Sequence, residues 1–477
     1  MISRRKLLRQ TACGFGSLAF AGLCAESVAR AGAPASTNPL AARLPMVPAR
    51  AKRIIFLFMQ GGPSQVDTFD YKPALEKYDG TELPFANSRK LANTGMSGEE
   101  RVMKALWKFR RYGECGQRVS ELFPHVARHV DDICFLFGMH TSGVAHGPST
   151  LFLHTGALNL IRPSVGSWIT YGLGTENENL PGFITIGPSS ANGGPRNYAN
   201  AFLPAHYQGT AIGRAEQSAA EMRFRDIDNL RLDRAAQQRQ LDLLQSLNRA
   251  QAGGHVSGAS RTSELDAVIN SYELAWRMQM HAPHVTDLSR ESPEMFAQYG
   301  IGEKETDDFG RQCLLARRMA EAGVRYIQVN YADNGNNPRW DQHSKMQLHE
   351  VHARAVDKPI AGLLADLKAR GLLEDTLVWW GGEFGRNPFA QGSDGRDHNP
   401  RGFTHFLAGG GVKPGFAFGE TDEFGHEAVA GRVHMHDLHA TLLYILGLNH
   451  ERLTYTYAGR EFRLTDVHGR VVHEILA

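Results

Sequence analysis

The sequence predicts a three-layer α/β/α sandwich around a mostly parallel β-sheet. Four short apolar runs support this prediction, because each is rich in strand-forming residues and leads into a polar loop. Helical patterns separate several of these runs, and strands that alternate with helices are typical of parallel sheets covered on both faces. The four runs are residues 53–59, 133–139, 324–330 and 377–380.

The segment before the first run reads as an export signal. Residues 1–31 combine the pair Arg4-Arg5, a weakly apolar stretch at 11–25 and a small-residue exit from Ala29 to Ala31. This order predicts a secretory signal of the twin-arginine type, although a basic disordered tail is the alternative. We therefore expect a periplasmic or otherwise exported protein that uses the twin-arginine export machinery and has no stable membrane insertion.

Composition restricts the class of protein. The net charge of the whole chain is +2, and residues 1–31 hold five of its basic and one of its acidic residues, so the remainder is near −2. That balance argues against nucleic acid as a partner. Three cysteines remain, which predicts at most one disulfide and no cysteine-based metal site. After a linker at 32–51, residues 52–477 have the length of one large α/β domain with an insertion.

The first run leads into Gln60-Gly61-Gly62-Pro63-Ser64, with Asp67 and Asp70 just beyond. The glycine pair would let the backbone approach a bound group closely, which makes these acids candidate ligand contacts. Equally, either aspartate could cap the next segment.

The second run leads into a loop that contains His140 and His146, followed by Ser149. Because both histidines lie on one loop at a strand end, they are candidates for a ligand site, and a structural role in the core or at the surface is the equal alternative. Farther on, the long polar helices at about 215–298 form a helical insertion. It either covers the site or is a solvated surface without a role in the chemistry.

The third run is followed by Trp340-Asp341-Gln342-His343. In an extended segment, alternate side chains point the same way, so Asp341 and His343 can converge on one ion. The fourth run stops at a glycine pair and presents Glu383 and Arg386, and the motif Asp397-His398 follows on a polar loop. Carboxylates and imidazoles at strand ends suit zinc, manganese or another divalent ion.

Near the C-terminus, Asp437 is expected to cap a helix. The neighbouring His436 and His439 are weaker candidates for ligands, because they fit a cap and a helix surface equally well.

Six motifs together resemble a known family. They are G-G-P-S-Q-V-D-T-F-D at 61–70, R-P-S-V-G-S-W at 162–168, W-D-Q-H-S at 340–344, G-E-F-G-R-N-P at 382–388, G-R-D-H-N at 395–399 and D-L-H-A-T-L at 437–442. On these motifs the mature chain resembles the exported proteins grouped as domain of unknown function number 1501, relatives of the alkaline phosphatase and sulfatase superfamily. The resemblance implies an alkaline-phosphatase-like fold that binds two metals, usually zinc, or one calcium in sulfatases. It also implies that Asp341, His343 and His398 hold one ion, and that Glu383 and Asp67 hold the second.

The chain departs from the enzyme pattern at the nucleophile. Sulfatases carry C-x-P-S-R, whereas here the similar run begins at His146 and has Thr150 in place of the arginine. The later D-H-G reads Glu383-Phe384-Gly385, which removes one imidazole ligand. A formylglycine sulfatase is therefore not expected. The candidate nucleophiles are His146, Ser142, Ser149 or a water activated by metal, with Arg386 or Arg396 binding the ester oxyanion.

The leading hypothesis is an exported metal-dependent hydrolase of sulfate, phosphate or related esters that acts on a small-molecule or glycan ester. Zinc is the first candidate metal, with calcium or manganese as alternatives. A second hypothesis is a non-catalytic, metal-containing binding or accessory protein that kept the fold but lost the usual nucleophile, and a third is transferase chemistry in the same cleft. The sequence does not indicate an oligomeric state.

Overall fold

The structure is a computed structural model. It describes residues 40–82, 101–225, 227, 229, 231–253, 259–390, 392 and 394–477, with the backbone alone at 248–253 and 259–271. The expected export signal at 1–31 and the first part of the expected linker lie outside these residues.

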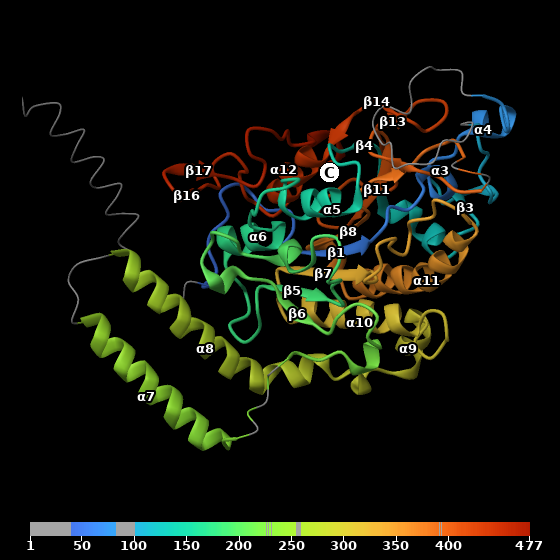
Figure 1. Cartoon of the computed structure of the whole chain (residues 1–477). Coiled ribbons are helices and arrows are strands. Elements are labelled where there is room, and N and C mark those ends of the chain that lie inside the picture. Colours follow the sequence, from blue (N-terminus) through green and yellow to red (C-terminus); the bar gives the residue numbers. More distant parts are fainter. Residues whose placement is uncertain are drawn as a thin grey trace, which may run out of the picture.

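A nine-stranded, mostly parallel sheet forms the centre of the molecule (Figure 1). The strand order is β12-β4-β11-β8-β1-β7-β5-β6, and β15 also pairs with β4. Only β11 runs antiparallel to its neighbours within this described sheet. The strands are β1 (Arg53–Met59), β4 (Ile133–His140), β5 (Phe183–Ile186), β6 (Thr210–Ile212), β7 (Tyr326–Tyr331), β8 (Thr376–Gly381), β11 (Phe403–Ala408), β12 (Phe416–Phe418) and β15 (Val433–His434).

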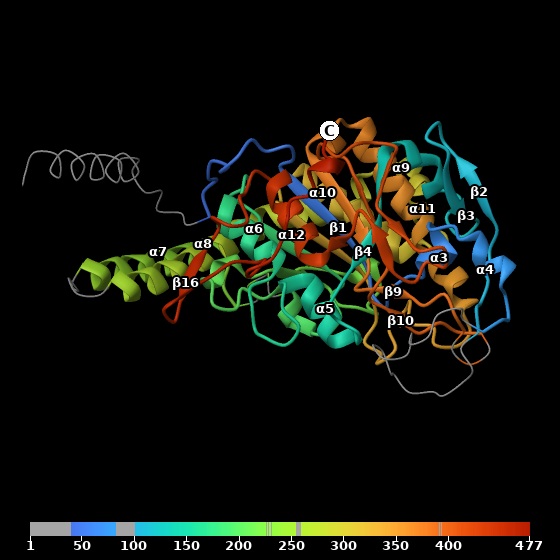
Figure 2. The same cartoon turned by 90° about the horizontal axis from the view of Figure 1, so that it is seen from above.

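Helices cover both faces of the sheet, which confirms the predicted fold class (Figures 1 and 2). In β1, Ile55 and Leu57 point to a core shared with α10 and α11, whereas Ile54 and Phe56 point to a core shared with α6 and α12. Because side chains alternate along a strand, a run that is apolar at every position can bury both faces. The helices are α10 (Asp307–Glu321), α11 (Leu348–Ala369), α6 (Val165–Leu173) and α12 (Met435–Ile445).

Shorter elements surround this framework. They are the helices α3 (Gln65–Thr68), α4 (Pro73–Lys77) and α5 (His146–Thr155), and the strand pairs β2 (Phe109–Tyr112) with β3 (Gln117–Ser120), β9 (Gly385–Arg386) with β10 (His398–Asn399), β13 (Glu420–Thr421) with β14 (Ala428–Ala430), and β16 (Tyr455–Tyr457) with β17 (Arg460–Phe462).

The start of α12 differs from the prediction. Asp437 is not the capping residue, because the helix begins at Met435 and His434 precedes it as the cap. The His434 ring accepts the backbone N–H of His436, and Asp437 accepts the backbone N–H of His434 at 3.0 Å. The two side chains thus close a reciprocal capping box, with histidine in the place that serine or threonine usually takes.

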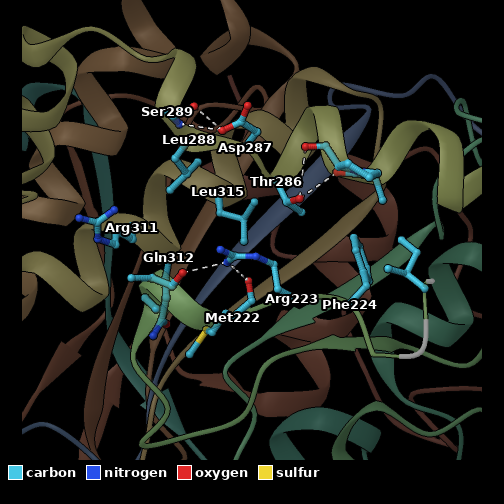
Figure 3. Close-up of a pocket in the computed structure, with 15 residues that line it drawn as sticks. Met222, Arg223, Phe224, Thr286, Asp287, Leu288, Ser289, Arg311, Gln312 and Leu315 are labelled. Atoms are coloured by element: carbon cyan, nitrogen blue, oxygen red, sulfur yellow. Dashed lines mark hydrogen bonds between the residues drawn. The ribbon is translucent and has the colours of Figure 1, made fainter. Parts of the chain in front are cut away.

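The predicted insertion contains α7 (Arg234–Gly253), α8 (Ala259–Thr286) and α9 (Pro293–Tyr299). In both views α7 and α8 lie side by side and extend away from the sheet (Figures 1 and 2). The end of α8 packs near α10, where a pocket of about 560 Å³ is lined by residues such as Met222, Thr286 and Leu315 (Figure 3). The cysteines Cys115, Cys134 and Cys313 are free. No helix in the described ranges has the length and apolarity needed to cross a membrane.

Candidate metal centre

Four side chains from three separate segments converge at the carboxyl ends of the central strands. His146 begins α5, Asp341 and His343 lie on the loop after β7, and His398 lies in β10. One potential ligand atom from each lies within 4.8 Å of the others. Asp341 is at the centre: its Oδ1 is 3.0 Å from His343 Nε2 and 3.2 Å from His398 Nε2, and its Oδ2 is 3.1 Å from His146 Nε2. The sequence had predicted Asp341, His343 and His398 as ligands, and the structure brings these three residues together.

The hydrogen bonds of His398 leave a lone pair facing this group. Its Nδ1 is 2.8 Å from the carbonyl oxygen of Val144, which can only accept, so Nδ1 carries the hydrogen. Burial lowers the pKa of His398 to about 4, so the ring is neutral at pH 7. Its Nε2 lone pair then points into the group, 3.2 Å from Asp341 Oδ1 and 3.1 Å from His343 Nε2. A cation among these atoms could be bound by the two imidazole nitrogens and the carboxylate together.

His146 has a similar arrangement. Its Nδ1 is 2.7 Å from Glu383 Oε1, so the carboxylate receives the Nδ1 hydrogen. The Nε2 atom is buried and lies near Asp341, yet it has no properly aligned hydrogen-bond partner in the described part of the chain. Burial would lower the pKa of His146, but the neighbouring carboxylates raise it above its ordinary value. A hydrogen bond from one ring nitrogen to a carboxylate is the usual way in which proteins orient a metal-binding histidine.

The local charge also favours a cation. Burial would raise the pKa of Asp341, but the Arg386 guanidinium at 2.7 Å and the three histidines hold that pKa far below its ordinary value. Asp341 and Glu383 are both almost fully buried, and Arg386 is paired with Asp341. A divalent ion would balance the remaining negative charge, and three imidazoles with one carboxylate are a ligand set that suits zinc.

Glu383 supports His146 and does not belong to the group of four. Both of its oxygens accept the backbone N–H of Gly61, at 3.0 and 3.1 Å, and Oε1 also accepts from His146. The resemblance implied that Glu383 holds a second ion, whereas in the structure its carboxylate binds Gly61 and His146. β8 ends at Gly381, and the Gly382 that follows lets Glu383 turn towards the first loop.

Asp67 is also separate from the group. Its Oδ2 lies 2.7 Å from Arg396 Nε and accepts from Ser64 Oγ at 2.5 Å, and its Oδ1 accepts from the backbone N–H of Leu106 at 3.2 Å. Both members of the Asp67–Arg396 pair are completely buried. This ion pair, which joins residues 329 positions apart, explains why Asp67 does not lie at the cluster.

The two arginines expected to bind an ester oxyanion are occupied. Arg386 donates to the carbonyls of Gly61, Gly62 and Arg396 in addition to its contact with Asp341. Arg396 donates to Asp67 and to three backbone carbonyls, those of Asn387, Met103 and Lys104. Because these bonds use most of the guanidinium hydrogens, both arginines hold the loops of the site in place.

The candidate serine nucleophiles do not join the group either. Ser149 is fully buried, and it lies so close to Gly143 that a Cβ on that glycine would come within 2.3 Å of Ser149 Oγ. Ser142 is hydrogen-bonded to His434 at 3.1 Å. Neither serine contacts the four residues of the group through a recorded hydrogen bond in the described ranges, whereas His146, predicted as a nucleophile or a ligand, is one of the four.

Three further groups support the cluster, and the sequence analysis missed two of them, both backbone atoms. Gly61 anchors Glu383 through its N–H, Val144 anchors His398 through its carbonyl, and Asp397 Oδ1 lies 3.6 Å from His343 Nδ1. Asp397 was visible as the acid in the G-R-D-H-N motif. The contacts of Gly61 and Val144 could not be predicted from residue type, because they are made by backbone atoms that almost every residue has.

A family model for proteins of unknown function, DUF1501, matches residues 51–476. The chain belongs to this family. The comparison of this DUF1501 protein with curated proteins finds no match.

Solved structures share a broad likeness with this DUF1501 protein. The lipoteichoic acid synthase LtaP from Listeria monocytogenes is 9% identical with a TM-score of 0.35, over 90% of this chain and 79% of that one. The PsFucS1 sulfatase from Pseudoalteromonas sp. is 11% identical with a TM-score of 0.34, over 84% and 68%. The phosphonate monoester hydrolase SpPMH from Silicibacter pomeroyi is 15% identical with a TM-score of 0.31, over 74% and 71%.

Proposed function

We propose that this protein is an exported, metal-dependent hydrolase of sulfate, phosphate or related esters, with one divalent ion held by His146, Asp341, His343 and His398. The observation that supports it most is the buried Nε2 of His146, which faces Asp341 without a hydrogen-bond partner in the described part of the chain. The Nε2 of His398 lies beside it, 3.2 Å from Asp341 Oδ1 and 3.1 Å from His343 Nε2. Zinc is the first candidate metal, and calcium or manganese are alternatives.

In this proposal the protein residues divide into two groups. His146, Asp341, His343 and His398 supply the nitrogen and oxygen ligands. Glu383 keeps the hydrogen of His146 on Nδ1, and the carbonyl of Val144 does the same for His398. A bound divalent ion supplies Lewis acidity, which stabilises negative charge on an ester oxygen and makes water more acidic.

The attacking group is then water and not a side chain. Both nitrogens of His146 have other roles, since Nδ1 binds Glu383 and Nε2 faces Asp341. Ser142 is hydrogen-bonded to His434, and Ser149 is not among the four clustered residues. An acceptor alcohol in place of water would give transferase chemistry at the same atoms, and product analysis with an added alcohol separates the two.

The absence of a hydroxyl or thiol nucleophile among the four clustered residues also favours a second candidate function. In that case the protein is a binding or accessory protein, and the metal holds the loops of the site together without turnover. The two functions share the metal and differ in hydrolysis.

Elemental analysis tests the metal, and an ester screen tests the reaction. We expect the purified mature protein to hold close to one equivalent of a divalent metal, and Asp341→Asn and His398→Asn to lose most of it. His281→Asn, at an exposed position on α8, is the matched control and retains metal. Hydrolysis of an aryl sulfate or phosphate that disappears with the metal supports the enzyme. Full metal without turnover of any ester supports the accessory protein, and no metal under any loading condition rejects both.

Export is tested separately. Fractionation of cells that express the full chain should place the mature form outside the cytoplasm. Replacement of Arg4-Arg5 by two lysines should leave the precursor inside, because the paired arginines are what the twin-arginine route recognises.

A further inference from the structure

Two sequence motifs that take no part in the metal centre meet at one pocket. The motif at 162–168 begins with Arg162, and the segment that opens α12 contains His434 and His436. Both line a pocket of about 690 Å³ together with Ser142, Phe202 and Arg463. Figures 1 and 2 place the neighbouring elements α5, α6, α12 and the β16–β17 pair together on one side of the sheet.

The pocket carries positive charge that nearby acids do not balance. Arg162 lies 4.2 Å over the ring of Phe462 and has no carboxylate within ion-pairing distance in the described ranges. Arg463 Nη1 is 3.9 Å from Glu451 Oε1, which is a weak contact at a partly exposed site. The acid among the lining residues, Asp466, is bound to Arg460 at 2.6 Å. An anionic group could therefore approach Arg162 without displacing an existing partner.

The pocket also offers hydrogen-bonding groups of both kinds. The His434 ring accepts the N–H of His436 at Nδ1, so its Nε2 carries the hydrogen and donates to Ser142 Oγ at 3.1 Å. The hydroxyl hydrogen of Ser142 is then available to a ligand. His436 is 4% exposed and donates through Nε2 to the carbonyl of Gly156, which leaves its buried Nδ1 as an acceptor without a partner. A ligand hydroxyl is the simplest donor for that atom.

Phe202 lines the pocket and packs in an aromatic cluster with Tyr457 and Phe462. The rings of Phe202 and Tyr457 stack with centroids 5.1 Å apart, and Phe462 lies 5.0 Å from Phe202. Tyr457 is 52% exposed. Exposed ring faces gain from covering the flat apolar side of a ligand. An anion, several hydroxyls and a flat carbon face are the features of an acidic sugar.

We infer that this pocket binds an acidic sugar unit, one that carries a sulfate or carboxylate group beside free hydroxyls. Arg162 and the Ser142 hydroxyl bind the anionic group, and His436 Nδ1 accepts a sugar hydroxyl. The inference rests on the proposed function in one respect: the pocket then holds a neighbouring unit of the glycan whose ester lies at the metal centre.

One loop joins the pocket to the metal centre. Ser142 lines the pocket, Val144 binds His398, and His146 begins α5. Four residues of extended chain span at most about 14 Å, so the two sites lie within reach of one oligosaccharide. The substrate class that follows is an acidic oligosaccharide and not an isolated small ester.

The test is equilibrium binding of a sulfated tetrasaccharide, compared with the same tetrasaccharide without sulfate and with inorganic sulfate alone. We expect the sulfated sugar to bind the protein and Arg162→Gln to weaken it by at least tenfold. Arg128→Gln should have no effect. This exposed arginine lies before the amino-terminal end of β4, whereas the pocket residue His434 pairs with His140 at the carboxyl-terminal end of that strand. His436→Gln should weaken the sulfated sugar but not inorganic sulfate. Thermal unfolding checks that each variant is folded.

The outcomes separate this inference from the proposed function. Binding that survives in metal-free Asp341→Asn protein but is lost in Arg162→Gln supports the pocket even if no ester is hydrolysed. Equal affinity of Arg162→Gln and the unaltered protein overturns the inference. The inference is also overturned if Asp341→Asn loses binding of the sulfated sugar while Arg162→Gln keeps it, since the sugar would then lie only at the metal centre. Binding of inorganic sulfate without any gain from the sugar rejects the sugar class.

Discussion

Glu383 Oε1 lies 2.7 Å from His146 Nδ1, and both oxygens of the same carboxylate accept the N–H of Gly61. This relationship makes Glu383 a positioning residue for a metal ligand. It also explains why a carboxylate at the end of a central strand does not itself reach the cluster. The difference between orienting a ligand and being one can be measured.

Glu383→Gln should weaken metal binding without abolishing it. The glutamine carbonyl can still accept from His146, but the charge that strengthens the imidazole as a ligand is lost, so we expect affinity to fall about 10- to 100-fold. Competition with a chelator measures this change, and the stoichiometry at saturating metal should stay at one. His146→Gln should weaken binding further because it removes a ligand. If Glu383→Gln and Asp341→Asn lose the same fraction of metal at saturation, Glu383 is a direct ligand after all.

Asp67→Asn should cost stability and leave the metal content unchanged. The substitution leaves Arg396 buried and without its charged partner, which costs about 3–5 kcal/mol of the free energy of unfolding. Asp79→Asn is the control: it removes a partly exposed pair with Lys104 and should cost less than about 1 kcal/mol. Chemical denaturation measures both effects. A variant that is equally stable but short of metal would restore Asp67 as a ligand.

Gly61→Ala should disturb the metal centre through the backbone. Gly61 has a φ of +109°, and an added Cβ would lie 2.7 Å from Trp340 N and 2.8 Å from Asp341 N. Since Asp341 must shift to make room, we expect both stability and metal affinity to fall. Gly371 also has a positive φ, of +69°, but a Cβ added there would meet nothing within 4 Å, so Gly371→Ala is the control. That control should cost about 1–2 kcal/mol of stability and leave metal affinity intact. Equal metal affinity in the two variants would contradict the prediction.

Asp357 should make stability fall as the pH rises. Burial raises the pKa of Asp357 to about 7, although the backbone N–H groups of Val126 and His125 bond to its oxygens and partly oppose the shift. The folded state therefore holds this proton more tightly than the unfolded chain, so its contribution is present below about pH 4 and is lost as the pH rises towards 7. Between pH 5 and pH 8 the unaltered protein should lose about 2–3 kcal/mol more than Asp357→Asn. Denaturation curves at both pH values give this difference. A difference of zero or of opposite sign would show that Asp357 is ionised throughout.

Local pattern was enough to predict the parallel framework. Runs such as 377–380 are apolar at every position because both faces of their strands are covered. The reversal of β11 could not be predicted, because the direction in which a strand pairs leaves no mark on a buried apolar run. Local pattern was also insufficient to predict which acids join the candidate metal centre. Asp341, His343 and His398 stood out as acids and imidazoles at strand ends, whereas Asp67 met the same description and differs only in lying beside Arg396.

The metal centre is assembled from distant parts of the chain. His146 and Glu383 are 237 residues apart, and Gly61 and Glu383 are 322 apart. A chain that ends before His398 lacks part of the proposed ligand set, so an ion can be fully bound only after most of the chain has been made and folded. If the centre binds an ion as proposed, the compartment in which folding finishes selects the metal. If the protein leaves the cell folded through the twin-arginine route, that choice is made in the cytoplasm, and its metal content records the ions available there and not those outside.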